Sequence, residues 1–181
     1  HGLAVAAAAK HAGAMAPIYL PMSVSPARAR RIEALGAELI WVRGTYDDAI
    51  RDAAAAAVGG KGLLIPDTSP GPNGGAVLDV VAGYGVLTRE LLCQFRKEEV
   101  SGPTHLFIQA GVGGLAAAVC GHLWETLGDR RPRVIVVEPE RAACLFESAA
   151  TGRPATIGGA LGTIMAGLPL GGGKAVILAH D

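Results

Sequence analysis

The chain has 181 residues, with 16 basic and 16 acidic side chains, so its formal net charge is zero. A neutral chain gives no electrostatic reason to expect nucleic acid or an anionic membrane surface as a partner. Half of the residues are hydrophobic, but no apolar run approaches the roughly 20 residues that a membrane-spanning helix needs. We therefore expect a cytoplasmic protein that acts on a small molecule.

The three cysteines, Cys93, Cys120 and Cys144, are odd in number and widely spaced. This pattern predicts reduced, mostly buried thiols rather than a disulfide framework. The sequence has no Cys-x-x-Cys pair and no His-x-x-x-His pair, and such pairs are typical of metal sites. We therefore predict no bound metal.

Helical and strand-like patterns alternate along the chain. Expected helices begin at N-cap candidates such as Ser25 and Thr45 and end at glycines such as Gly13. The expected helices cover residues 2–13, 25–36, 45–58, 76–97, 115–127 and 140–151, and the expected strands cover residues 16–21, 37–42, 62–66, 104–109 and 133–139. The alternation predicts an α/β fold in which helices flank both faces of a parallel sheet.

The loop DTSPGPNGG, residues 67–75, is dense in turn-forming residues and separates two sets of strands and helices. We place a lobe boundary in this loop. The sequence thus predicts a small lobe of residues 1–70 and a large lobe of residues 71–181, each a parallel sheet flanked by helices in a three-layer α/β/α arrangement.

The segment THLFIQAGVGGLAAAVCGHL, residues 104–123, runs from an expected strand through a glycine turn into an expected helix. Backbone amides at the start of a helix are unpaired and carry partial positive charge, and glycines let a phosphate approach them closely. We therefore predict a phosphate site at the turn formed by Gly111, Val112, Gly113, Gly114 and Leu115. The simpler alternative is a tight turn that only packs the helix against the sheet.

One ligand that suits this turn is a dinucleotide. Gly111, Gly113 and Ala116 satisfy the relaxed GxGxxG/A spacing, and Glu138 ends the next expected strand, where a ribose-binding acid belongs. A dinucleotide fold, however, usually has this turn after its first strand, whereas several strand–helix units precede it here. An NAD-dependent amino-acid dehydrogenase stays open as an alternative.

Four segments over nearly the whole chain carry a family resemblance: HGLAVAAAAKHAGAMAPIYLP, RARRIEALGAELIWVRGTYDDAIRDA, PTHLFIQAGVGGLAAAV and VVEPERAACLFESAATGRPATIGGALGTIMAGL. They resemble, in the same order, the fold-type-II pyridoxal-phosphate enzymes, the group of threonine dehydratase and serine racemase. The first is similar to the end of that family's Ser-x-Gly-Asn-His-Gly motif, and the third to its phosphate loop. The fourth, with Val-Glu-Pro and Ile-Met-Ala-Gly-Leu, most specifically resembles the diaminopropionate ammonia-lyases.

This resemblance implies pyridoxal phosphate as the cofactor, with its phosphate at Gly111–Gly114 and with Glu138 facing the cofactor cleft unless it is simply solvated. It implies a β-elimination of ammonia from 2,3-diaminopropionate that yields pyruvate and ammonia. It places His1 near the substrate carboxylate and matches Asp67 to an active-site aspartate that handles a proton or holds the second amine of the substrate. A turn in which Asp67 only caps its own backbone is the alternative. Family members tend to be dimers, so a homodimer is also implied.

The resemblance also points to a lyase truncated at both ends. The family's Schiff-base lysine lies upstream of its Asn-His-Gly motif, and residue 1 is the histidine, so we expect this chain alone not to catalyse the elimination. The last residues, PLGGGKAVILAHD, resemble instead the substrate-site lysine motif of glutamate, leucine and phenylalanine dehydrogenases, and Lys174 is a candidate substitute for the lysine. A non-catalytic, phosphate-binding remnant of the lyase fold is a third hypothesis.

Overall fold

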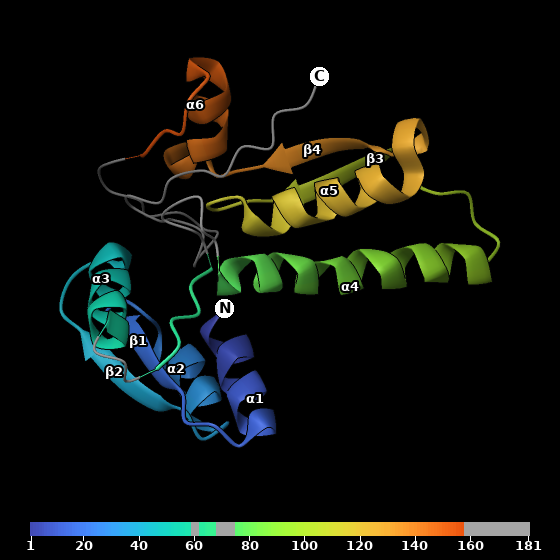
Figure 1. Cartoon of the computed structure of the whole chain (residues 1–181). Coiled ribbons are helices and arrows are strands. Elements are labelled where there is room, and N and C mark those ends of the chain that lie inside the picture. The colour runs from blue at the N-terminus through green and yellow to red at the C-terminus, as the bar shows by residue number, and fades with distance from the viewer. Residues whose placement is uncertain (59–61, 68–74, 158–181) are drawn as a thin grey trace. The chain divides into compact units, whose positions relative to one another are not determined.

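A computed structural model of the chain describes residues 1–58, 62–67 and 75–157, and these residues fall into two compact units that divide after Asp67 (Figure 1). Each unit contains a pair of parallel strands with helices packed against it. The predicted α/β fold with parallel strands is therefore confirmed.

The first unit alternates helices and strands. Its elements are α1 (Gly2–Ala12), β1 (Pro17–Pro21), α2 (Pro26–Glu33), β2 (Glu38–Val42) and α3 (Tyr46–Ala56). Strands β1 and β2 pair in parallel, from Pro17 opposite Glu38 to Pro21 opposite Val42. A small apolar core joins the sheet to α1 and α2, and its buried members are Ala6, Ala16, Ile18, Leu20, Ala29, Ile32 and Ala37.

Local sequence signals explain most of the helix ends in this unit. Helix α1 stops at Gly13, which has the left-handed φ of 66° that glycine adopts without a steric penalty. Helix α2 starts with Pro26, whose fixed φ suits a first helical position. Ser25 occupies the N-cap position as predicted, but its side chain makes no capping hydrogen bond. Its hydroxyl therefore does not contribute to starting the helix.

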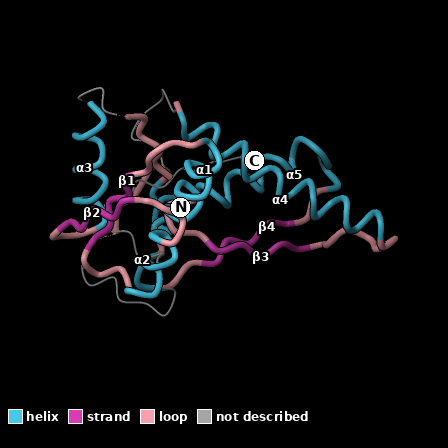
Figure 2. Tube along the Cα trace, turned by 90° about the horizontal axis from the view of Figure 1, so that it is seen from below, coloured by secondary structure: helices cyan, strands magenta, loops and turns pink. Residues whose placement is uncertain are grey.

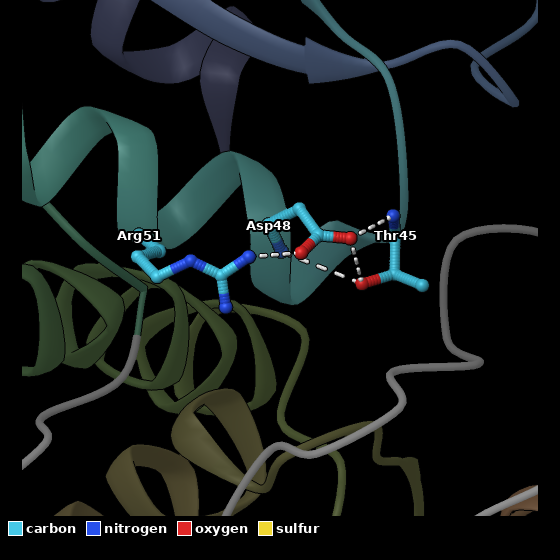
Figure 3. A network of polar contacts seen from close by, with 3 residues as sticks. All are labelled: Thr45, Asp48 and Arg51. Carbon is cyan, nitrogen blue, oxygen red and sulfur yellow. Dashed lines mark hydrogen bonds and ion pairs between the residues drawn. The ribbon is translucent and has the colours of Figure 1, made fainter.

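Helix α3 begins with a capping box (Figure 3). The Asp48 carboxylate accepts hydrogen bonds from the Thr45 backbone N–H at 2.6 Å and from the Thr45 hydroxyl at 2.9 Å. The guanidinium of Arg51 donates to the other carboxylate oxygen. These contacts lower the pKa of Asp48 below its ordinary value of 3.8. The first turn of α3 is thus held by side chains that all belong to residues 45–51.

We expect this cap to make the stability of the first unit depend on pH. Because the folded-state pKa of Asp48 is lowered, its stabilising effect is complete above 3.8 and is lost as the pH falls through the folded-state pKa. Asp48→Asn should therefore destabilise the unit at neutral pH and flatten the acid limb of the stability profile. Urea unfolding at a series of pH values measures this, with Asp52→Asn on the exposed side of α3 as the control. An Asp48→Asn profile parallel to the wild-type profile would contradict the expectation.

The second unit is built around a long helix and a second parallel pair. Its elements are α4 (Ala76–Lys97), β3 (His105–Gln109), α5 (Gly114–Leu127), the short helix η2 (Gly128–Arg130), β4 (Arg133–Val137), the short helix η3 (Glu140–Ala142) and α6 (Cys144–Thr151). Strands β3 and β4 pair from His105 opposite Arg133 to Gln109 opposite Val137. Helices α4 and α5 run side by side on one side of this sheet (Figure 1 and Figure 2). The core is formed by the buried residues Ile108, Ala110, Ala116, Val119 and Leu123.

One expected strand is not formed. Residues 62–66 were predicted as a strand from the apolar run Gly-Leu-Leu-Ile-Pro, but within the described chain they pair with no strand. Leu63 is 78% exposed and Ile65 is 36% exposed, and Pro66 has no N–H to offer to a ladder. The prediction is wrong because an apolar run specifies a strand only where a neighbouring strand supplies its hydrogen bonds.

Helix α4 contains a buried hydroxyl that we expect to weaken the fold. Thr88 is fully buried, and its Oγ1 has no hydrogen-bond partner in the part of the chain that the structure describes. An unpaired buried polar group costs stability, so Thr88→Val should raise the free energy of unfolding by about 1 kcal/mol. Urea unfolding measures the change, and Thr126→Val on the exposed face of α5 controls for the altered side chain. A destabilised Thr88→Val protein would show that the hydroxyl is satisfied.

Candidate functional site

The glycine turn joins the end of β3 to the start of α5. The Ala110 N–H donates to the Val137 carbonyl at 3.1 Å, which continues the ladder one residue beyond β3. Gly113 is the N-cap of α5 and has φ 96° and ψ −5°, a left-handed conformation that favours glycine. Val112 and Gly113 are buried. The turn is therefore a defined structure whose backbone requires a glycine at position 113.

The first amides of α5 are available to a ligand. The first helical hydrogen bond of α5 runs from the Ala117 N–H to the Gly113 carbonyl, at 2.8 Å. The amides of Gly114, Leu115 and Ala116 precede that bond, and the described residues supply no acceptor for them. Unpaired amides at a helix start carry the positive end of the helix dipole. The arrangement suits an anion such as a phosphate group.

Cys144, which the sequence predicts to be a core residue, contacts this turn. The Cys144 thiol is buried and donates to the Gly111 carbonyl at an S–O distance of 3.0 Å. Burial, and then the negative charge of Glu138, raise the pKa of Cys144, so the thiol stays protonated and remains a donor. Because the peptide bonds are trans, the Val112 N–H points opposite to the Gly111 carbonyl, away from Cys144. The contact therefore fixes the direction of one more amide in the turn.

Glu138 has a partner that the sequence did not predict. Its Oε1 accepts the Leu145 N–H and its Oε2 accepts the Phe146 N–H, both at 2.9 Å. These are amides of the first turn of α6, whose own N-cap, Ala143, has no polar side chain. Glu138 therefore caps α6 with both carboxylate oxygens. A ribose-binding acid needs those oxygens for ribose hydroxyls, so this geometry counts against the dinucleotide alternative.

The two predicted catalytic residues, His1 and Asp67, both belong to the first unit, where His1 contacts the segment 62–67 that ends at Asp67. The His1 Nε2–H donates to the Ile65 carbonyl at 2.7 Å. The Tyr46 hydroxyl donates to Asp67 Oδ2 at 2.6 Å. Burial, and then the negative charge of Asp67, raise the pKa of Tyr46 well above its ordinary value. No motif in the sequence pairs Tyr46 with Asp67, so this contact could not be predicted from the sequence.

Comparison of the chain with known proteins shows the family to which it belongs. The protein-family model described as pyridoxal-phosphate dependent enzyme matches residues 1–180. The chain belongs to the pyridoxal-phosphate dependent enzymes. Its resemblance to the fold-type-II group and to the ammonia-lyases is confirmed by individual relatives. The diaminopropionate ammonia-lyase of Salmonella typhimurium is 38% identical over 94% of the chain, and the L-threonine dehydratase of Bacillus subtilis is 31% identical over 87% of it.

Solved structures of pyridoxal-phosphate dependent enzymes support the same family and fold. The holo diaminopropionate ammonia lyase from Escherichia coli superimposes with a TM-score of 0.83 at 33% identity and covers 97% of the chain. Maize serine racemase superimposes with a TM-score of 0.77 at 23% identity, which speaks for the fold alone. The chain spans 43% of the length of the first of these structures and 43% of the Salmonella relative.

Other predicted features lie partly or wholly outside the described residues. The tail with Lys174 is among them, so the substitute lysine and the resemblance of the tail to the dehydrogenases both stay predictions. Lys10 and Lys97, two other lysines of the chain, lie in the last turns of α1 and α4.

No helix within residues 1–58, 62–67 and 75–157 is long and apolar enough to cross a membrane. The same ranges contain no group of three His, Cys, Asp or Glu side chains suited to a metal ion.

Proposed function

We propose that this chain carries the cofactor-phosphate site and part of the substrate site of an enzyme that eliminates ammonia from 2,3-diaminopropionate, giving pyruvate and ammonia. The observation that carries the proposal is the start of α5, where amides with no acceptor among the described residues follow a glycine of left-handed backbone. The identity of 38% to a diaminopropionate ammonia-lyase supports the substrate. The two units then correspond to parts of a small lobe, residues 1–70, and a large lobe, residues 71–181.

The donors present at the glycine turn fit the phosphate of pyridoxal phosphate. The amides of Gly114 and Leu115 precede the helical bonds of α5, and the amide of Val112 is directed by the contact of Cys144 with Gly111. We assign Gly111–Leu115 to the phosphate, while Glu138 supports the site indirectly by capping α6. When bound, the cofactor supplies an electron-withdrawing ring that stabilises negative charge at the α-carbon of an amino acid.

The first unit supplies the groups that we assign to the substrate. A diamine needs a negatively charged partner, and the Asp67 carboxylate, held by the Tyr46 hydroxyl, provides one. Asp67 either binds the second amine of the substrate or gives it a proton as it leaves. The His1 Nε2–H is occupied by the Ile65 carbonyl, so only Nδ1 of this ring can accept a proton or a ligand. His1 thus contributes by holding the segment that carries Asp67, in addition to its predicted place near the substrate carboxylate.

Ligand binding to the chain tests the phosphate site. We expect pyridoxal phosphate to bind at least about tenfold more tightly than pyridoxal, and inorganic phosphate to compete with it, because most of the specificity comes from the amides. Titrations followed by Trp fluorescence measure both. Equal affinities for pyridoxal phosphate and pyridoxal would overturn the assignment of the phosphate site. Binding of NADH without competition from pyridoxal phosphate would favour the dehydrogenase alternative instead.

Turnover tests the substrate. We expect the Schiff-base lysine to lie upstream of residue 1, so the assay uses a longer polypeptide that includes such a lysine. We expect ammonia and pyruvate to be released from 2,3-diaminopropionate, with L-serine and L-threonine as poorer substrates. Preference for L-threonine with no release from the diamine would overturn the substrate assignment but would leave the cofactor assignment intact.

A further inference from the structure

We propose that Tyr46 is a positioning residue for the reaction: its phenol fixes the orientation in which the Asp67 carboxylate meets the amine of a diamino acid substrate. This inference rests on the proposed function for the substrate, and on the structure alone for the Tyr46–Asp67 contact. It assigns to Tyr46 a part in distinguishing a diamino acid from an amino acid that carries a hydroxyl.

The contact has the geometry of a strong hydrogen bond. The Tyr46 hydroxyl oxygen lies 2.6 Å from Asp67 Oδ2, within the range of a hydroxyl that donates to an ionised carboxylate. Both residues are half-buried, so water competes less for either group than it does at an exposed pair. The pKa of Tyr46 is raised, so the phenol keeps its proton and remains the donor.

The contact acts on a segment that no strand ladder holds in the described chain. Residues 62–67 pair with neither β1 nor β2, so no ladder in the described chain fixes this segment. The His1 ring holds it at the Ile65 carbonyl, two residues before Asp67. That bond acts on the backbone of the segment and not on the Asp67 side chain. The Tyr46 hydroxyl, in contrast, donates to the carboxylate itself.

Tyr46 is well placed for this purpose because it is the first residue of α3. The start of that helix is fixed by the capping box of Thr45 and Asp48 and by Arg51 (Figure 3). Helix α3 in turn packs against β1. The phenol therefore extends from a helix start that the capping box fixes. Through its hydrogen bond, the Tyr46 side chain connects this helix start to the Asp67 carboxylate.

Alkaline titration of the chain tests the contact without any cofactor. The chain has three tyrosines, and phenolate absorbance counts those that ionise while circular dichroism shows that the fold persists. We expect one tyrosine to resist ionisation, Tyr46→Phe to remove that tyrosine, and Asp67→Asn to let it ionise at lower pH. Tyr84→Phe, which changes a half-buried tyrosine of α4, is the control and should leave the resistant tyrosine in place. If Asp67→Asn left the titration unchanged, the pair would not exist in solution.

Substrate discrimination tests the positioning role. In the longer polypeptide used for the turnover assay, we expect Tyr46→Phe to lower kcat/KM for 2,3-diaminopropionate by about tenfold, the loss of one charge-assisted hydrogen bond. For L-serine, which lacks the second amine, the change should stay within about twofold. Tyr84→Phe should change neither value. Equal losses for both substrates, or no loss for the diamine, would overturn the inference.

The two tests separate this inference from the proposed function. If the wild-type protein bound pyridoxal phosphate but released nothing from the diamine, the proposed substrate would fail while the titration still reported on Tyr46 and Asp67. If the diamine were a good substrate and Tyr46→Phe left the substrate preference unchanged, the proposed function would stand and the positioning role would fail.

Discussion

Replacing Glu138 by Gln is expected to lower the free energy of unfolding of the second unit by about 2–3 kcal/mol. The carboxylate accepts two amides of the first turn of α6, at 2.9 Å each, where the helix dipole favours negative charge. Glutamine keeps one acceptor oxygen but turns an NH2 group toward the second amide. One hydrogen bond is therefore replaced by a contact between two donors.

Urea unfolding followed by circular dichroism measures this loss, with Glu140→Gln as the control because Glu140 is an exposed acid two residues along the chain. The result also decides between two roles for Glu138. A helix cap loses stability in the variant without any ligand present. A residue that contacts only the cofactor would leave the stability unchanged and weaken the binding of pyridoxal phosphate, and that result would contradict the capping role.

Gly113→Ala is expected to destabilise the chain by about 1–2 kcal/mol, because a Cβ is unfavourable in left-handed backbone. Gly113 has φ 96° and forms the N-cap of α5. To escape this strain, the turn must change its backbone angles, and the amides that follow it then change direction. We therefore also expect pyridoxal phosphate to bind at least about tenfold more weakly, whereas the affinity for pyridoxal should change little.

Gly121→Ala provides a matched control in the same helix. Gly121 lies inside α5, and a Cβ added there meets nothing within 4 Å. This variant should gain about 0.5–1 kcal/mol of stability, because alanine is the better helix former, and should bind pyridoxal phosphate like the wild type. The comparison requires a pyridoxal phosphate titration and a urea unfolding curve for each of the two variants. Wild-type affinity in Gly113→Ala would show that the phosphate lies elsewhere.

The regular elements of this fold were predictable because their signals are local. Thr45 starts α3, Gly13 ends α1, and the alternation of helices and strands predicts the parallel pairs that the structure contains. At two places the local signal was not sufficient. The run 62–66 has the composition of a strand, but a strand forms only where a neighbouring strand supplies hydrogen bonds; Ser25 has the side chain of an N-cap, but residue type alone does not decide whether its hydroxyl turns toward the nearby amides.

In the candidate site, too, features with a local sequence signal were predictable and contacts between distant residues were not. The glycine turn was predictable, because Gly113 meets a backbone requirement that one residue carries by itself. The partners of Glu138 and Asp67 were not, since each bond joins residues that no short motif relates. Leu145 lies seven residues from Glu138, and Tyr46 lies 21 residues from Asp67. Such pairs arise only when the packing of helices brings the side chains together.

The bonds of Glu138 and Cys144 have a consequence for the energetics of anion binding. They connect the end of β4, the start of α6 and the glycine turn within one unit. The conformational entropy of this turn is therefore lost when the chain folds, not when a ligand arrives. A phosphate that binds there meets preorganised dipoles, so little reorganisation energy is subtracted from its affinity.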